Sequence, residues 1–333
     1  MLVKQLFLLQ ALGIFAFVNS LNPKPPPFGQ LSVSGTKLVS ANGQPVQLIG
    51  NSLSWHTLWP QYWDAGTVKG IKCGWNANVI RAAMGVESVD AGNGVMKGGY
   101  LSDPNNAYRM ITTVIEAAIS EGLYVIVDWH AHEPHANEAA AFFTRIAKSY
   151  GQYPHILYET YNEPLKISWN NVLVPYHKQV VGAIRAVDQK NVIILGTPFW
   201  SQNVDEAAQN PIQGFKNLMY TLHYYASSHF VHDIGNKLRT ANSKGLPVFV
   251  TEYGVCEASG DGRIDQNSAN QWWGLLDYFK ISYVNWSIAG PPQSCSALQP
   301  GTSPWSVGDP SKWTAAAHFV ANYHKNKPTG VRC

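Results

Sequence analysis

Charged residues, cysteines and long apolar segments are all scarce in this 333-residue sequence. Only 14% of the residues are charged, and the 24 Lys and Arg residues are scattered, for a net charge of +3. Neutralising phosphate groups takes clustered basic side chains, so we expect no binding to nucleic acid. A hydrophobic content of 45% at this low charge argues against a disordered chain and is ample for a large core.

The four cysteines are too few for a disulfide scaffold, and their spacings match no zinc motif. We therefore expect no metal bound by thiolates. The cysteines allow at most two bridges, in three possible pairings. They are Cys73, Cys256, Cys295 and Cys333.

The one long apolar run covers residues 6–18, after a short basic start and before the small residues Asn19 and Ser20. This pattern predicts a secretory signal peptide over residues 1–20. A membrane anchor needs about 20 apolar residues, and no later segment supplies them, so we expect no membrane contact. The prediction is a secreted, extracellular protein with a Pro-rich lead-in at residues 21–30 and a single domain at residues 31–333.

Aromatic residues, in contrast, are abundant, with 12 Trp, 16 Tyr and 12 Phe. Two interpretations remain open at this point. A large core absorbs these side chains, or many of them line an open groove that stacks flat, polar ligands such as sugar rings.

Eight short apolar runs, rich in β-branched residues, recur along the chain and alternate with helix-like stretches such as Ala107–Glu121. Buried strands alternating with amphipathic helices indicate a parallel sheet covered by helices, and eight such units predict an α/β fold, the (β/α)8 TIM barrel. A doubly wound open sheet is the alternative, but no Gly-x-Gly-x-x-Gly follows the first strand. Before the runs, Leu31–Val33 and Lys37–Val39 flank Ser34-Gly35 and predict a small N-terminal β-hairpin. The eight runs are Val46–Gly50, Ala77–Arg81, Tyr124–Asp128, Ile156–Tyr161, Val192–Gly196, Met219–His223, Val248–Thr251 and Tyr283–Ser287.

Polar residues stand at the C-terminal ends of six of these runs, where a TIM barrel carries its active site. Two of them are glutamates, Glu163 and Glu252. Hydrolysis of a glycoside needs one carboxylic acid to protonate the leaving oxygen and one carboxylate beside the anomeric carbon, so this pair suggests that reaction. The six strand ends are Arg81, Asp128-Trp129-His130, Asn162-Glu163-Pro164, His223-Tyr224-Tyr225, Glu252-Tyr253-Gly254 and Asn285-Trp286.

Each of these residues also has a structural interpretation. Asn162 and Pro164 could cap a helix around Glu163. Arg81 could be only an ion-pair partner of Glu252, and Trp286 a plug in the barrel. The pair His130 and His132 could bind zinc, but the later strands lack the further ligands that such a site needs, so we expect no metal.

Six stretches in this order resemble glycoside hydrolase family 5. The resemblance covers about Leu31 to His324 and is closest to the bacterial-type cellulases and to the secreted endoglucanases of plant-parasitic nematodes. The stretches are Arg81–Gly85, Tyr161–Pro164, Gly196–Pro198, Trp200–Asp205, Leu222–Ala226 and Phe249–Gly254.

The resemblance implies a retaining mechanism without a cofactor, in which Glu163 is the acid/base and Glu252 the nucleophile. We expect a raised pKa for Glu163, which must be protonated at first, and an ionised Glu252 beside Arg81. The other implied substrate-binding residues are Arg81 and Tyr225 at the nucleophile, Asn162 at the sugar 2-hydroxyl, His130 and His223 lining the subsite, and Trp286 as a stacking platform.

Two segments depart from the family. Residues 287–294, after the eighth strand, carry no charge, whereas related enzymes place a Lys and a Glu there to bind sugar. The loop at residues 86–99 is long and Gly-rich. Because the loops after strands seven and eight are neighbours in a barrel, we expect a bridge between Cys256 and Cys295, which leaves Cys73 and Cys333 as the remaining pair.

The sequence therefore predicts a secreted, monomeric, retaining endo-β-1,4-glucanase whose partner is plant cell-wall β-1,4-glucan. The uncharged loop leaves xylan, mannan or xyloglucan open as the substrate of the same mechanism. A polysaccharide-binding protein with little or no turnover is the further alternative.

Overall fold

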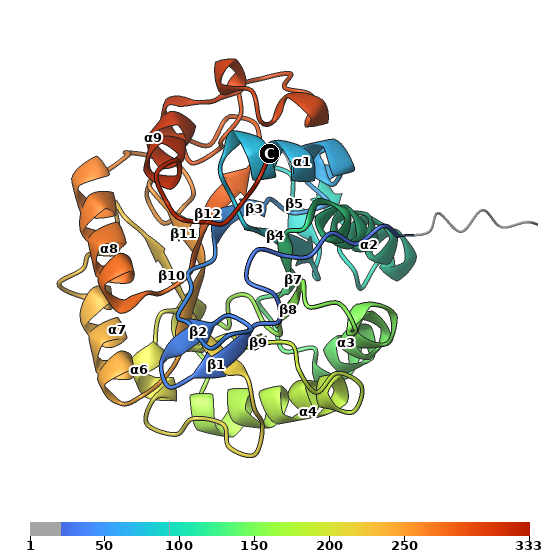
Figure 1. Ribbon diagram of the computed structural model, residues 1–333, viewed down its shortest axis with the longest axis vertical. Helices are drawn as coiled ribbons and strands as arrows, with labels where there is room; N and C mark the ends of the chain where they lie inside the picture. Colours follow the sequence, from blue (N-terminus) through green and yellow to red (C-terminus); the bar gives the residue numbers. More distant parts are fainter. Residues whose placement is uncertain (1–20, 93) are drawn as a thin grey trace, which may run out of the picture.

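Eight parallel strands close into a barrel in the order β10-β11-β12-β3-β4-β7-β8-β9, and the helices surround it (Figure 1). The computed structural model describes residues 21–92 and 94–333, so the predicted signal peptide at residues 1–20 lies outside the described residues. The predicted TIM barrel is confirmed. The barrel strands are β3 (Ile49–Leu53), β4 (Val79–Gly85), β7 (Tyr124–His130), β8 (Ile156–Glu159), β9 (Ile193–Leu195), β10 (Leu218–Tyr225), β11 (Val248–Gly254) and β12 (Tyr283–Ile288).

Each of the eight predicted runs overlaps a barrel strand, but the first run begins and ends too early in the chain. We expected the first strand at Val46–Gly50, and β3 begins only at Ile49. Asn51 and Ser52 are buried in β3 although they are polar, which hid this strand from a search for apolar runs. The register is parallel throughout, so the C-terminal ends of all strands meet at one face of the barrel.

Helices with clear caps were the easiest to predict. Asp103 accepts the Asn106 N–H at the start of α2, Pro104 occupies the first turn, and Gly122 ends the helix in the left-handed region at φ 74°. The sequence predicts six helix-like stretches, at Ala107–Glu121, Glu138–Tyr150, Pro175–Val187, His232–Lys244, Gln266–Lys280 and Lys312–His324. They correspond to α2 (Pro104–Glu121), α3 (Ala136–Tyr150), α4 (Val174–Arg185), α7 (Ile234–Ser243), α8 (Gln266–Phe279) and α9 (Ala315–His324). Not predicted were α1 (Ala65–Gly74), α5 (Pro198–Ser201), α6 (Val204–Ala207) and the single turns η1 (Pro60–Tyr62), η2 (Trp169–Leu173), η3 (Pro304–Ser306) and η4 (Pro310–Lys312).

The N-terminal hairpin closes the end of the barrel opposite the strand C-termini. It consists of β1 (Ser32–Ser34) and β2 (Lys37–Val39), as predicted, and lies across the barrel axis (Figure 1). Leu31 and Leu38 pack there in a buried cluster with strand residues such as Tyr124 and Phe249. This plug leaves the opposite face as the open end of the barrel.

The predicted long loop contains a two-stranded ribbon, β5 (Val89–Asp90) with β6 (Met96–Lys97). Both predicted disulfides are present, Cys256–Cys295 between the loops that follow β11 and β12, and Cys73–Cys333 between α1 and the C-terminus. Among the described residues, no helix combines the length and the hydropathy that a membrane crossing requires.

Candidate active site

Glu252 lies near the C-terminal end of β11, where side chains from two other strands hold its carboxylate. Arg81 on β4 donates from Nη1 to Oε2 at 2.8 Å, and the Tyr225 hydroxyl on β10 donates to Oε1 at 2.8 Å. Glu252 is 4% exposed. The structure thus brings together the three residues that the sequence placed at three separate strand ends.

Glu163 follows β8 and faces Glu252 across the open end of the barrel. His223 Nδ1 lies 3.0 Å from its Oε1, and His132 Nε2 lies 3.4 Å from its Oε2. One carboxylate oxygen of Glu163, one of Glu252 and a ring nitrogen of His223 all lie within 4.8 Å of one another. The two carboxyl groups are therefore close enough to act on opposite sides of a single bond.

A chain of buried hydrogen bonds connects His223 to the floor of the site. His223 Nε2 lies 2.9 Å from Thr251 Oγ1, and that hydroxyl donates to Glu159 Oε1 at 2.5 Å. Glu159 Oε2 in turn accepts from Arg81 Nε at 2.7 Å. Since the single hydrogen of the Thr251 hydroxyl goes to Glu159, Thr251 accepts from His223, and His223 is protonated at Nε2.

The carboxylates around His223 favour its charged form. Although burial acts in the opposite direction, the carboxylates of Glu159, 3.7 Å from Nε2, and Glu163, 3.0 Å from Nδ1, raise the pKa of His223 to about 9. Hydrogen bonds to Glu163 likewise raise the pKa of His132 against its burial. Burial raises the pKa of Glu163, but the bonds from His132 and His223 outweigh it and bring that pKa to about 2.

The expected pKa order of the two glutamates was therefore wrong for the free protein. We expected a raised pKa at Glu163, and the two histidines lower it instead. We expected Arg81 to keep the Glu252 pKa low, but burial raises that pKa in spite of Arg81 and His223. In the free protein, the two histidines therefore favour the carboxylate form of Glu163.

Arg81 is completely buried and neutralises several carboxylates at once. Besides Glu252 and Glu159, its guanidinium lies 2.9 Å from Asp128 Oδ2. Burial disfavours the charged form of Arg81, but its pKa is raised overall because all three carboxylates stabilise the cation. Removing Arg81 would leave the buried carboxylates of Asp128, Glu159 and Glu252 without a cation, which destabilises the fold. Arg81 therefore stabilises the folded protein in addition to holding Glu252.

The aromatic wall of the site lies on the side of β7 and β12. The His130 ring stacks on Trp286 with an interplanar angle of 2° and a centroid distance of 5.5 Å. Burial and nearby Arg81 lower the pKa of His130, so this ring is neutral and donates from Nδ1 to Asp128 at 2.7 Å. Asn162 Oδ1 accepts from Arg81 Nη2 at 2.8 Å, which leaves the amide NH₂ of Asn162 as the donor available to a ligand.

Two cavities lie at the loops of the open end of the barrel. One, of about 300 Å³, is lined by Glu163, His223 and Tyr225 and extends to Trp200 and His229. The other, of about 480 Å³, lies beside Trp59 at the uncharged segment Gly290–Gln293, and Asp90 and Lys97 of the β5–β6 ribbon also line it. The first cavity is the candidate catalytic groove, because Glu163 lines it.

Glu163, His223 and Glu252 are also the one group among the described residues that could surround a metal ion. Both nitrogens of His223 already have partners, one in Glu163 and the other in Thr251. His130 Nδ1 is occupied by Asp128. These contacts fit an acid–base site better than a metal site.

The comparisons with known proteins agree with this geometry. Residues 39–290 match the family described as Cellulase (glycosyl hydrolase family 5). The chain belongs to glycosyl hydrolase family 5. Among the family's proteins, Endoglucanase Z of Dickeya dadantii is 40% identical over 81% of this chain, and an endoglucanase of Clostridium saccharobutylicum is 36% identical over 88%. The chain spans 62% and 64% of the lengths of these two relatives.

Two solved structures align with this chain over nearly their whole length. One from Cytophaga hutchinsonii is 42% identical, with a TM-score of 0.85 over 90% of this chain and 95% of that one. The catalytic domain of Thermobifida fusca endoglucanase Cel5A is 32% identical, with a TM-score of 0.81 over 90% and 98%. The present chain thus covers nearly the whole of the Thermobifida fusca catalytic domain.

Three residues of this hydrogen-bonded network were missed from the sequence, namely His132, Glu159 and Thr251. His132 was weighed only as a zinc ligand, but its ring reaches Glu163. The signal for Glu159 was its position as a charged residue inside the apolar run Ile156–Tyr161, because a buried charge needs a partner. Nothing in the sequence distinguished Thr251 from the other hydroxyls on the strands.

Proposed function

We propose that this protein is a retaining endo-β-1,4-glucanase in which Glu252 is the nucleophile and Glu163 the acid/base. The observation that carries the proposal is the separation of the two carboxyl groups, with oxygens within 4.8 Å of each other. A retaining enzyme needs carboxyl groups about 5 Å apart, whereas an inverting one leaves room for a water molecule between them. The endoglucanase names of the relatives support the polymer.

In the first step, a Glu252 oxygen attacks the anomeric carbon and forms a glycosyl ester. The bond from that carbon to the glycosidic oxygen breaks, and Glu163 gives its proton to the departing oxygen. Arg81 and Tyr225 orient Glu252 for the attack through their bonds to its two oxygens. Asn162 donates its amide hydrogen to the 2-hydroxyl of the reacting sugar.

Glu163 receives the proton for this step from its histidine neighbours. In the free protein His223 is the cation and Glu163 the carboxylate, joined at 3.0 Å. A sugar bound over the pair excludes water and disfavours the separated charges, so the proton moves from His223 Nδ1 to Glu163 Oε1. His223 then keeps its Nε2 hydrogen on Thr251 and remains neutral.

In the second step, Glu163 is again a carboxylate and accepts a proton from a water molecule. The resulting hydroxide attacks the anomeric carbon and releases Glu252, which restores the starting configuration of the sugar. Trp286, backed by the ring of His130, supports the flat face of the sugar during both steps.

The polymer is β-1,4-glucan in this proposal. A family 5 catalytic domain 31% identical to this chain has been solved in complex with cellotetraose, which supports a gluco-oligosaccharide in the groove. The uncharged segment at residues 287–294 favours the alternative of xylan, mannan or xyloglucan, because charge-assisted bonds to sugar hydroxyls are missing there.

Four further predictions concern the location, domain extent and assembly of the protein. We expect it to be secreted after removal of residues 1–20 and to have its catalytic domain at residues 31–333. We also expect it to act as a monomer and without a cofactor. These stay predictions from the sequence. The likeness to the endoglucanases of plant-parasitic nematodes also stays a prediction, supported by the motifs quoted above.

A panel of soluble polymers tests the proposal. Reducing ends are measured after incubation with carboxymethyl cellulose, barley glucan, xylan, mannan and xyloglucan. We expect release from the first two, and expect both Glu252→Gln and Glu163→Gln to lower it by at least about a hundredfold without loss of the fold. Release of reducing ends from one of the other polymers alone would identify that polymer as the substrate. No release from any polymer would favour a polysaccharide-binding protein.

A further inference from the structure

We propose that Trp305 and the trough beside it form a second carbohydrate-binding site, which holds a β-1,4-glucan chain on the outer flank of the barrel. The proposal rests on the proposed function, because it takes the ligand class from the catalytic groove. The flank is where α1 and α2 lie side by side (Figure 1). No residue of this site belongs to the catalytic groove.

Trp305 is a large aromatic side chain on the surface of the molecule. It is 72% exposed and lies in the single turn η3. A Cβ added at Gly66 of α1 would lie 2.7 Å from Trp305 Cδ2 and 2.8 Å from Cε3, so the ring packs closely on the backbone of α1. No aromatic ring within residues 21–92 and 94–333 stacks on it, so its exposed surface is available to stack on a sugar.

The segment that carries Trp305 is fixed in place. The indole N–H groups of Trp75 and Trp313 both donate to the Val307 carbonyl, at 3.1 Å and 2.8 Å. Gly308 packs directly on Gly70 of α1, with backbone atoms in close contact. A platform held in this way loses little conformational entropy when a ligand stacks on it.

A trough of about 590 Å³ lies beside the indole, between α1 and α2. Thr113, Glu116 and Ser120 line one face of α2, and at a rise of 1.5 Å per residue they extend over about 10 Å, the length of a disaccharide unit. Small side chains, Ala65 and Ala117, also line the trough. The trough thus continues the proposed sugar-binding surface from the Trp305 ring along α2.

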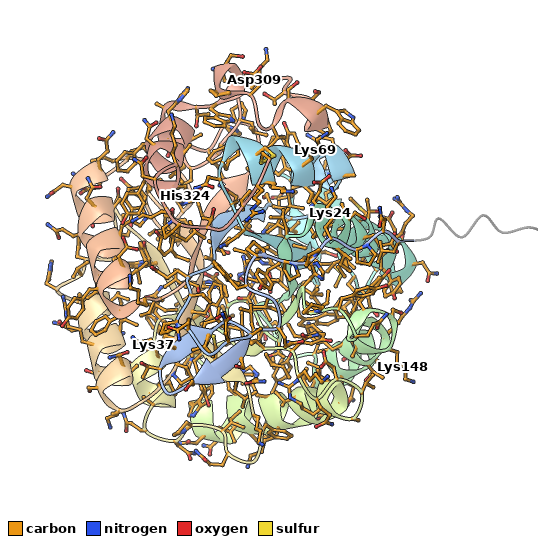
Figure 2. All side chains as sticks on the ribbon, viewed as in Figure 1. Lys24, Lys37, Lys69, Lys148, Asp309 and His324 are labelled. Carbon is orange, nitrogen blue, oxygen red and sulfur yellow. A yellow bond between two sulfur atoms is a disulfide. The ribbon has the colours of Figure 1, made fainter. Side chains whose placement is uncertain are left out.

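The polar groups along the trough match a hydroxyl-rich neutral chain. Lys69 supplies donors, and the Ser120 hydroxyl both donates and accepts. The Thr113 hydroxyl donates to the Arg109 carbonyl and Glu116 Oε1 accepts from the Tyr150 hydroxyl, so toward a ligand these two side chains act as acceptors. Figure 2 shows Lys69 on α1, between the segment of Asp309 and the N-terminal stretch at Lys24. An apolar protein helix in this trough would bury the Lys69 ammonium without offering it an acceptor, at considerable cost, whereas sugar hydroxyls accept from it.

Binding to insoluble cellulose tests the site. It is measured in the Glu163→Gln background, so that hydrolysis does not consume the ligand. We expect Trp305→Ala to weaken binding by about three- to tenfold, the value of one lost aromatic stacking contact. Trp305→Phe should retain most of the binding. Ala65→Glu should weaken it, because the larger side chain fills the trough. An acid is tolerated at this position because Ala65 is the first residue of α1, where the helix dipole favours negative charge.

The matched control is Tyr278→Ala, since Tyr278 is 80% exposed but lies on α8, away from α1 (Figure 1). Equal binding by the Trp305 and Tyr278 variants would overturn the proposal, as would loss of binding in both. Cleavage of cellotetraose is measured in parallel with Glu163 restored, and Trp305→Ala should leave it unchanged. If the protein does not cleave cellotetraose at all, the proposed function fails, while the difference in binding still decides the second site.

Discussion

His223 links the two candidate catalytic carboxylates through hydrogen bonds that fix the position of its protons. On one side it meets Glu163 at 3.0 Å, and on the other it reaches Glu159 through Thr251. Glu159 and Glu252 share the guanidinium of Arg81. A change of charge at Glu159 therefore alters the electrostatic surroundings of both Glu163, through His223, and Glu252, through Arg81. Glu159 itself does not face the groove.

Glu159→Gln tests this positioning role. The substitution keeps the size of the side chain but removes the negative charge that stabilises the His223 cation, so the pKa of His223 should fall. We expect kcat/KM at pH 8 to fall by about ten- to a hundredfold, with a smaller loss near neutral pH. A uniform loss at every pH would show a merely structural effect, and Thr112→Ser on α2 serves as a conservative control remote from the site.

The pH dependence of kcat/KM follows from the same contacts. The pKa of His223 is about 9, above its ordinary value of 6.5, so the proton of the His223–Glu163 pair is present below pH 9 and is lost as the pH rises through it. Burial raises the pKa of Glu252 above 4.5, so activity should fall in acid as this nucleophile becomes protonated. An alkaline limb near pH 6.5 would contradict the assignment of the proton to His223.

At the scale of single elements, α1 shows why part of the fold escaped prediction. Its sequence contains Gly66, Gly70 and Gly74, which is unfavourable for a helix. The structure explains these glycines, because Gly70 and Gly74 pack on the backbone of Gly308 and Gly66 packs against the ring of Trp305. Close backbone contact, invisible in a local pattern, outweighs the poor helix propensity here.

Gly70→Ala should therefore destabilise the protein although alanine favours helix. A Cβ at Gly70 would lie 2.8 Å from the Gly308 nitrogen, and we expect a loss of about 1–3 kcal/mol in the free energy of unfolding. Gly274→Ala in α8 is the matched control, because nothing lies within 4 Å of its added Cβ. There we expect a gain of about 0.5–1 kcal/mol by denaturant titration. Destabilisation by both variants would contradict the packing argument.

Strands and long helices were predictable because their apolar side chains repeat with the period of the element. The ends of these strands also located Arg81, Glu163 and Glu252, since a barrel collects strand ends at one face. The pKa values could not be predicted in this way. They depend on which side chains approach Glu163 and Glu252 in space, and His132 and Glu159 entered that neighbourhood only with the folded chain.

At the scale of the whole molecule, the barrel has a closed end and an open end that carries the candidate active site. The β1–β2 hairpin plugs one end, while the glutamates and the groove occupy the other. The Cys73–Cys333 disulfide joins the C-terminus to α1, and the Cys256–Cys295 disulfide joins the loops at the open end. Aromatic residues divide between the core and the surfaces proposed to bind sugar, in line with the few charges in the chain.

The most direct test of the central claim is the configuration of the first product. Cleavage of cellotetraose is followed by proton NMR from the moment of mixing, before the released sugar equilibrates. Double displacement by Glu252 and Glu163 predicts that the β-anomer appears first, and that Glu252→Gln abolishes its formation. Initial appearance of the α-anomer would contradict the account, because it would require direct attack by water without the Glu252 ester.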